Sequence, residues 1–380
     1  MMDERVYCVA WLQVYGIGSI LLRRLQARFD SLATAWGASA VDLATVEGLG
    51  KQKVASIVEQ RSKLDPTALF QQHAERNPQF WTIFEADYPR LLREIPNPPA
   101  ILYYRGAPDL DELQGITATV AIVGTRQPTE YGRRWTNRLS GALARRGVTV
   151  VSGLAAGIDT EAHRACLAAG GRTIAVFGTG VDVVYPTQNR SLYERILKSG
   201  WAVSEYPAGT QPDRKHFPQR NRIIAGLSRA TLVTEAPKKS GALITAYVAN
   251  DFGRDVYAIP GSLDNLNSHG CLGLISRGAT LVFDEAHFLE MLCDMPGLDT
   301  AASSQTPVEP PPQSEPKPTP QPDLDPHLDR VFSAVPPEPV PLDLIVHQLD
   351  EETSFVSGAL LQLELMGLVS QLPGMRYQRC

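Results

Sequence analysis

The chain has 380 residues, of which 43% are hydrophobic and 20% are charged, and its formal net charge at pH 7 is −5. This length suits more than one domain with a sizeable core, and the negative charge means that any nucleic-acid binding must come from a local basic patch. The five cysteines are scattered and form no CxxC pair, and no apolar run approaches the length of a membrane span. We therefore expect a reduced, cytoplasmic protein without a zinc site, a disulfide framework or a membrane anchor.

Residues 1–64 are predicted to form a small helical module. Two turns, Gly16–Gly18 and Gly48–Gly50, each precede a helical pattern that carries cations. This arrangement is typical of a helix-hairpin-helix (SAM-like) module, whose glycines let backbone N–H groups approach a DNA phosphate. A module that uses the same turns only for packing fits equally well, and both interpretations stay open.

Residues 65–296 are predicted to hold a lead-in and a Rossmann-like core. Short strands are expected at Phe80–Phe84 and Ile101–Tyr104 in the lead-in. Seven apolar runs are predicted strands of the core: 120–123, 148–152, 173–177, 201–204, 230–234, 255–259 and 280–283. Because helical patterns separate these runs, the fold class is α/β with a mostly parallel sheet covered on both faces. Ligands of such sheets bind beyond the carboxyl ends of the strands, where this chain places its glycine-rich turns.

The end of the chain is predicted to contain a linker and a third domain. Residues 297–326 include nine prolines among polar residues, so we expect an extended or disordered tether. Residues 327–380 show three helical patterns and then two short strands, which together describe a winged helix. The third helical pattern, Thr353–Met366, carries Glu364 and no lysine or arginine. That composition favours contact with protein over reading of a DNA groove, although DNA binding stays open.

Two features of the core indicate binding of a nucleic acid. Gly124 ends a predicted strand, so N–H groups of the next turn can face an anion, and Arg126 adds a fork of donors. The segment Arg214–Arg222 places four cations around Phe217 with no acid among them, and we read it as a shaped basic turn. Cations for phosphates and an aromatic ring for a base are the components of a single-strand binding groove. The predicted DNA-binding residues are Gly124, Thr125, Arg126, Arg214, Lys215, Phe217, Arg220, Asn221 and Arg222.

Catalysis is not predicted. Asp159 and His163 are four residues apart on a predicted helix, but no further metal ligand has matching spacing. We expect Asp159 to cap the helix and His163 to form a hydrogen bond within the core. Glu235 ends a strand and Ser240 begins a helix, yet neither belongs to a recognisable catalytic motif. No Walker loop or complete dinucleotide fingerprint occurs, so no catalytic residue, metal or cofactor is assigned.

With these residues in hand, the chain closely resembles the DNA-processing protein A (DprA, or Smf) family. The motifs that carry the resemblance are the YP-L-IP-PP lead-in (88–99), VGTR (123–126), SGLAAGIDTEAH (152–163), TIAVFGTGVDVVYPTQN (173–189), SEYPAGT (204–210), FPQRNRIIAGLS (217–228), VTEA (233–236), SGALITA (240–246) and IPGS (259–262). The helical module and the winged helix also match the larger members. One position departs from the family's G-x-N-x-L-I pattern, because Leu272 stands where asparagine is usual.

The resemblance implies a non-catalytic protein that binds single-stranded DNA, forms a homodimer and loads the RecA recombinase during natural transformation. It also implies a dimer interface at the end of the core, which in this chain is predicted to include Leu263, Leu266, Leu272 and Ile275. An alternative is a nucleotide-processing enzyme of the lysine-decarboxylase-like phosphoribohydrolase type, which Glu235 and Ser240 faintly resemble. Those enzymes carry PGGxGT before the glutamate-bearing helix, whereas this chain has Ala236–Gly241 (APKKSG) there.

Overall fold

The computed structural model describes residues 2–293, 325–336, 340–349, 351, 353–372 and 376–379. The chain divides into two compact units, Met1–Ala301 and Ala302–Cys380, and each is described by itself. Most of the predicted linker, residues 297–324, lies outside the described residues. In the described ranges, no helix combines the length and the apolar character needed to cross a membrane.

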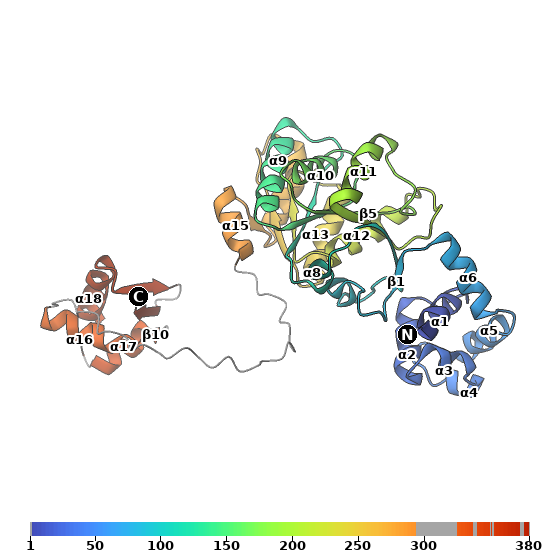
Figure 1. The fold of residues 1–380 in the computed structure, drawn as a ribbon. Helices are drawn as coiled ribbons and strands as arrows, with labels where there is room; N and C mark the ends of the chain where they lie inside the picture. The colour runs from blue at the N-terminus through green and yellow to red at the C-terminus, as the bar shows by residue number, and fades with distance from the viewer. Residues whose placement is uncertain are drawn as a thin grey trace, which may run out of the picture. The chain divides into compact units, whose positions relative to one another are not determined.

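The first unit begins with a module of six helices (Figure 1). These are α1 (Met2–Leu12), α2 (Ser19–Phe29), α3 (Leu32–Gly37), α4 (Ala40–Leu43), α5 (Lys51–Arg61) and α6 (Pro66–Arg76). Both predicted GxG turns immediately precede a helix, and Gly16 and Gly48 have φ values of +87° and +91° that favour glycine. Helix α6, which the sequence reading assigned to the lead-in, packs against α1.

The lead-in joins the helical module to the core sheet. Strands β1 (Phe80–Thr82) and β2 (Ile101–Gly106) pair antiparallel, as do β2 and β6 (Gly200–Ser204). Phe80, Ile101 and Tyr103 share a buried cluster with side chains of α1, α2 and α5. The connecting helices are α7 (Arg90–Arg93) and α8 (Leu110–Gln114).

A nine-stranded sheet forms the core, and all seven strands predicted for residues 120–283 are present. The remaining strands are β3 (Thr119–Val123), β4 (Thr149–Ser152), β5 (Thr173–Phe177), β7 (Ala230–Val233), β8 (Asp255–Ala258) and β9 (Thr280–Leu281). The order is β1-β2-β6-β5-β4-β3-β7-β8-β9, and every pair from β6 to β9 is parallel. After β3 the chain moves toward β4 and after β7 toward β8, so the strand order reverses between β3 and β7. Such a reversal is where open α/β sheets bind their ligands.

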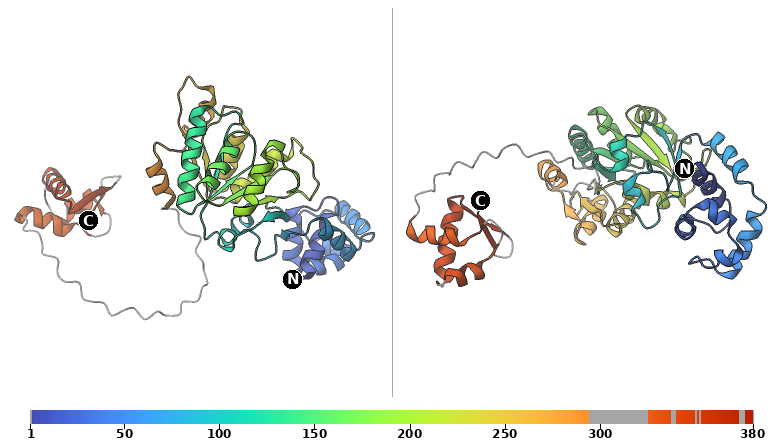
Figure 2. Two further views of the ribbon diagram at one scale, coloured as in Figure 1. Left: turned by 45° about the horizontal axis from the view of Figure 1, so that its top comes forward. Right: turned by 60° about the horizontal axis from the view of Figure 1, so that its bottom comes forward.

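Helices cover both faces of the sheet, as predicted (Figures 1 and 2). One face packs against α9 (Glu130–Arg145), α10 (Ile158–Ala168), α11 (Arg190–Ser199) and α15 (Glu285–Cys293). The other face packs against α12 (His216–Gly226), α13 (Gly241–Asp251) and α14 (His269–Ile275). Gly147 and Gly170 follow α9 and α10 with positive φ values, which confirms the two helix ends predicted at these glycines.

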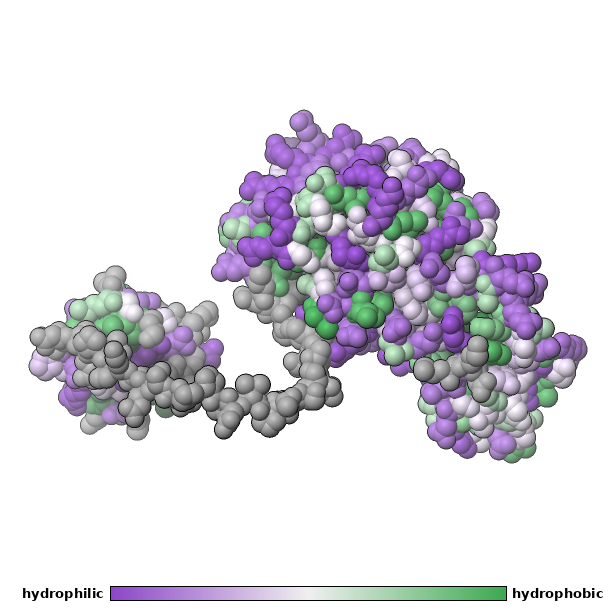
Figure 3. All heavy atoms as spheres, viewed as in Figure 1, coloured by the Kyte–Doolittle hydropathy of each residue, from purple (hydrophilic) through white to green (hydrophobic). Residues whose placement is uncertain are grey.

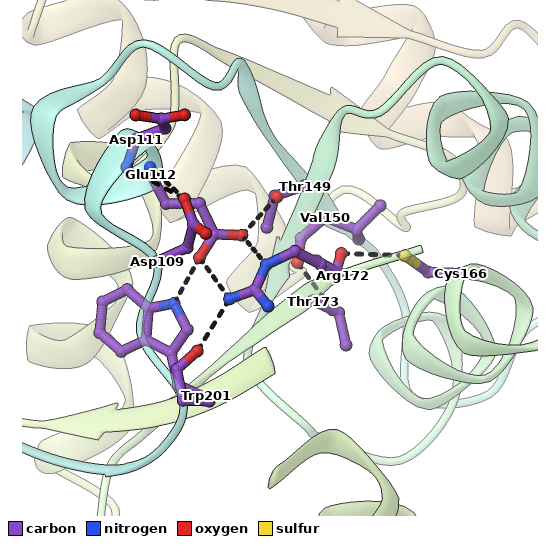
Figure 4. A network of polar contacts seen from close by, with 10 residues as sticks. Asp109, Asp111, Glu112, Thr149, Val150, Cys166, Arg172, Thr173 and Trp201 are labelled. Carbon is purple, nitrogen blue, oxygen red and sulfur yellow. Dashed lines mark hydrogen bonds and ion pairs between the residues drawn. The ribbon is translucent and has the colours of Figure 1, made fainter. Parts of the chain in front are cut away.

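A buried carboxylate ties the lead-in to the amino-terminal edge of the sheet (Figure 4). The Glu112 carboxylate of α8 accepts hydrogen bonds from Arg172 at 2.8 and 3.0 Å, from Thr149 at 2.6 Å and from the Trp201 indole at 2.9 Å. Its partners lie at the start of β4, just before β5 and in β6. These four bonds join three strands at the edge opposite the glycine-rich turns.

The second unit has the predicted winged-helix pattern. Its elements are α16 (Pro326–Ala334), β10 (Val340–Pro341), α17 (Leu342–Leu349), α18 (Thr353–Leu365), β11 (Val369–Leu372) and β12 (Arg376–Arg379). Val356, Leu360 and Leu363 of α18 are buried against the other two helices. The short strand β10, which pairs with β12, was not predicted.

Candidate nucleic-acid interface

A cleft of about 610 Å³ opens where the strand order reverses. One wall is the turn after β3, residues Val123–Arg126, and another is the segment after β7, from Pro237 to Ala242. The beginning of α12 forms the third side. Of the nine predicted DNA-binding residues, seven line the cleft: Gly124, Thr125, Arg126, Arg214, Phe217, Arg220 and Asn221. Lys215 and Arg222 are not among the lining residues.

Backbone contacts hold the turn after β3 in place. The Thr125 N–H donates to the Glu235 carbonyl at 2.7 Å, and the Ile158 N–H donates to the Thr125 carbonyl at 3.1 Å. A Cβ atom on Gly124 would lie 2.5 Å from Ile158 Cγ1 and 2.8 Å from the Glu235 carbonyl oxygen, so glycine is required for this close packing. The turn therefore presents Arg126 from a fixed backbone.

A cation and two aromatic rings meet inside the cleft. The guanidinium carbon of Arg126, an exposed residue, lies 5.7 Å from the centroid of the Phe217 ring. The Phe217 ring lies 5.6 Å from the ring of Tyr185, which is also exposed. This geometry offers a cation for a phosphate beside flat aromatic faces for a base.

The interpretation of Arg214–Arg222 as a basic turn is wrong in part, because α12 begins at His216. Arg220 is 4% exposed, and its guanidinium donates to the carbonyls of Gly153, at 2.8 Å, and Val176. Arg222 makes a paired contact with the Glu205 carboxylate at 2.9 and 2.7 Å. Both side chains are engaged inside the protein, which leaves Arg214 and Lys215 as the exposed cations of this segment.

Sequence reasoning did not assign two further residues of the cleft. Lys239 is exposed and lines the wall after β7, and Tyr185 lines the side beside Phe217. In the sequence, Lys239 directly precedes Ser240, and Tyr185 belongs to the VDVVYPTQN motif. Their place next to β3 depends on the strand order, which the sequence alone does not give.

The four residues considered as catalysts have structural contacts. Glu235 is 1% exposed, and its carboxylate accepts hydrogen bonds from the Thr129 N–H at 2.8 Å and the Thr129 hydroxyl at 2.7 Å. The expectation that Asp159 caps the helix is wrong, because Gly157 is the N-cap residue of α10. The Asp159 carboxylate instead accepts hydrogen bonds from the N–H groups of Gly153 and Ala155, so it holds the loop before α10.

The other two candidates are equally engaged. His163 pairs with the Thr173 hydroxyl at 2.7 Å within the core, as expected, and burial lowers its pKa to about 3. The Ser240 hydroxyl accepts from the Ala242 N–H at the start of α13. Each side chain therefore serves the fold around the cleft.

The four residues predicted for self-association differ in exposure. Leu263 and Leu266 are 78% and 72% exposed, whereas Leu272 and Ile275 of α14 are half-buried. Ile275 packs against the main core cluster, so less of its surface is available to a partner.

Comparisons with known proteins match both units. Residues 79–293 match the family model described as DNA recombination-mediator protein A, and residues 315–375 match the DprA winged helix domain. The chain is 49% identical to Protein Smf from Synechocystis over 99% of both chains.

Two solved structures share the fold. That of DNA processing protein A from Streptococcus pneumoniae has a TM-score of 0.66 and 37% identity, over 75% of this chain and 97% of that one. A structure that concerns the single-stranded DNA binding mode of DNA processing protein A from Helicobacter pylori has a TM-score of 0.51 and 30% identity, over 57% and 96% of the two chains. On these matches and on the motifs that line its cleft, the chain belongs to the DNA-processing protein A (DprA/Smf) family.

Proposed function

We propose that this protein binds single-stranded DNA in the cleft between β3 and β7 and loads the RecA recombinase onto the bound strand during natural transformation. The observation that carries the proposal is the convergence of Arg126, Arg214, Lys239 and the Phe217 ring on one cleft at the strand-order reversal. The family's description as a recombination mediator and the DNA-binding relative from Helicobacter pylori support it.

The chemistry of the cleft favours a single strand over a duplex. Exposed guanidinium and ammonium groups neutralise phosphates, while Phe217 and Tyr185 offer ring faces that can stack only on an unpaired base. Every base has such a face, so we expect binding to depend strongly on salt and weakly on sequence. The local cations explain how a chain of net charge −5 can bind a polyanion.

The proposal includes self-association and a non-catalytic role in the cytoplasm. Leu263, Leu266 and Leu272 supply apolar surface near α14 for a symmetric interface. One strand bound to two linked clefts would dissociate more slowly than a strand bound to a single cleft, because the second contact forms at high effective concentration.

A nucleotide-processing enzyme is the second candidate, and the contacts of Glu235 count against it. A general base must reach the substrate proton, but the Glu235 carboxylate is buried and hydrogen-bonded to Thr129 and Asn265. It is not among the residues that line the cleft. This arrangement makes Glu235 a support of the turn after β3.

The test is fluorescence anisotropy of the full chain with single- and double-stranded oligonucleotides, beside a nucleotide hydrolysis assay. Arg126→Ala should weaken single-strand binding roughly ten- to a hundredfold, since a charged hydrogen bond contributes about 1.5–3 kcal/mol. Arg195→Ala, which removes an exposed arginine of α11 away from the cleft, is the matched control. Unchanged affinity in a folded Arg126→Ala variant would remove Arg126 from the site, and nucleotide hydrolysis would favour the enzyme.

A further inference from the structure

A second hollow, of about 480 Å³, adjoins the cleft at Arg126. We call it the arginine hollow, because Arg126, Arg133 of α9 and Arg164 of α10 line it. Arg126 lines both the cleft and this hollow, so its side chain stands at the boundary between them. A linear polymer that lies in the cleft and extends past Arg126 therefore enters the hollow.

The arginine hollow has a positive balance of charge. Arg133 and Arg164 are exposed, and Glu161 is the acidic residue among those that line it. Glu161 lies 3.9 Å from Arg164 and accepts a hydrogen bond from Asn137 at 3.4 Å. In the described ranges, no carboxylate lies within ion-pair distance of Arg133, so this guanidinium is available to an anion. The surface over α9 is also largely hydrophilic in Figure 3.

The backbone around the hollow is preformed. Helix α10 begins there, and its N-cap Gly157 has no side chain to occupy the positive end of the helix dipole. Gly157 has a φ of +86°, and a Cβ atom on it would lie 2.4 Å from the Thr125 carbonyl oxygen. On another side, the buried Asn189 amide donates to the Leu154 carbonyl at 3.0 Å and to the Thr160 hydroxyl at 2.8 Å. The Asn189 bonds thus join two walls of the hollow, and the bond from the Ile158 N–H to the Thr125 carbonyl joins α10 to the turn that carries Arg126.

We propose that the arginine hollow binds the phosphodiester backbone of the same DNA strand after it passes Arg126, with Arg133 and Arg164 as phosphate contacts. The inference rests on the proposed function, and it adds a second segment to the DNA site. The cleft offers aromatic rings for bases and cations for their phosphates, whereas the hollow lacks an aromatic side chain among its lining residues and so contacts the backbone alone. A strand that fills both bends around Arg126 and covers more nucleotides than the cleft can hold.

The test compares full-length wild type with the double variant R133Q/R164Q by fluorescence anisotropy on oligothymidylates of about four and about ten nucleotides. The longer oligonucleotide should bind the variant roughly a hundredfold more weakly or worse, because two charged contacts of about 1.5–3 kcal/mol each are lost. For the longer oligonucleotide, a plot of log affinity against log salt concentration should have a slope that is smaller in magnitude by about 1.4, at roughly 0.7 for each phosphate contact on a single strand. The shorter oligonucleotide, which the cleft alone can hold, should bind almost as it does to wild type.

The matched control is R134Q/R195Q, which removes two exposed arginines of α9 and α11 that do not line the hollow. It should keep wild-type affinity for both oligonucleotides, since it changes the net charge equally but not the charge of the hollow. The inference would be overturned if R133Q/R164Q kept wild-type affinity and salt dependence, or if the control lost as much affinity for the longer oligonucleotide. Neither result decides whether the cleft binds DNA, which Arg126→Ala tests separately. A wild-type protein that binds neither oligonucleotide would overturn the proposed function itself.

Discussion

At the scale of single residues, the sequence identified Arg126 and Arg214 as cations of the site, but it did not give Lys239 or the direction in which each cationic side chain points. In a turn all four cations of Arg214–Arg222 could face solvent, but a helix that begins at His216 fixes their directions. Helical spacing puts Arg220 on the same side as Ile223 and Ile224, which are buried against the sheet. Arg220 therefore supports the floor of the cleft, and the exposed Arg214 is left for a ligand.

This difference predicts opposite effects for two substitutions in one segment. Burial raises the pKa of Asp159 and lowers that of Arg220 to about 10, while the attraction between the two groups offsets part of both shifts. Arg220→Met leaves the buried carbonyls of Gly153 and Val176 without their donor, so it should lower the free energy of unfolding by about 2–6 kcal/mol, at about 1–3 kcal/mol for each unpaired group. Arg214→Gln should leave that free energy almost unchanged and weaken DNA binding.

Urea denaturation, followed by circular dichroism, measures the first effect, and oligonucleotide anisotropy measures the second. A stable Arg220→Met variant that loses only DNA affinity would show that Arg220 contacts the strand directly. A destabilised Arg214→Gln variant would show that our division between supporting and binding cations is wrong.

At the scale of elements, the sheet was predictable and the short or proline-containing elements were not. Each core strand is an apolar run bounded by polar or glycine-rich turns, and that signal is local. The pairing of β3 with β7 is not local, so the walls of the cleft could not be assembled from the sequence. Pro218 belongs to the segment that the sequence predicts as a basic turn, but it lies near the start of α12, where its missing N–H has no helical partner to lose. Strand β10 has two residues, too few for a periodic pattern.

The prediction on self-association concerns helix α14. Leu272 is half-buried and is not part of the main core cluster, whereas its neighbour Ile275 packs against that cluster. Leu272→Glu should therefore give a folded monomer that binds long oligonucleotides much less tightly than wild type, because two linked clefts gain effective concentration. Ile275→Glu is the contrast, and it should destabilise the fold.

Sedimentation of the purified variants separates the outcomes. A folded Leu272→Glu variant that still sediments as a dimer would exclude Leu272 from the interface. An unfolded Leu272→Glu variant would show that Leu272 is part of the core packing and not of an interface.

At the scale of the whole molecule, an acidic chain carries a small basic site. Every residue that lines the cleft or the arginine hollow belongs to the unit Met1–Ala301, where the strand-order reversal brings together turns distant in sequence. The sequence predicted the winged helix correctly, but its binding partner stays a hypothesis, as does that of the helical module. Single-strand binding therefore belongs to the core in the proposed function and does not require the second unit.

Photochemical crosslinking of the full chain to an oligonucleotide that carries 5-iodouracil tests this claim most directly. The modified base reacts with an aromatic ring on which it stacks, so mass spectrometry should locate the crosslink on the peptide that contains Phe217 or on that with Tyr185. Arg126→Ala should reduce its yield. Crosslinks found only in residues 1–64 or 327–380, with none on peptides of the cleft, would contradict the account.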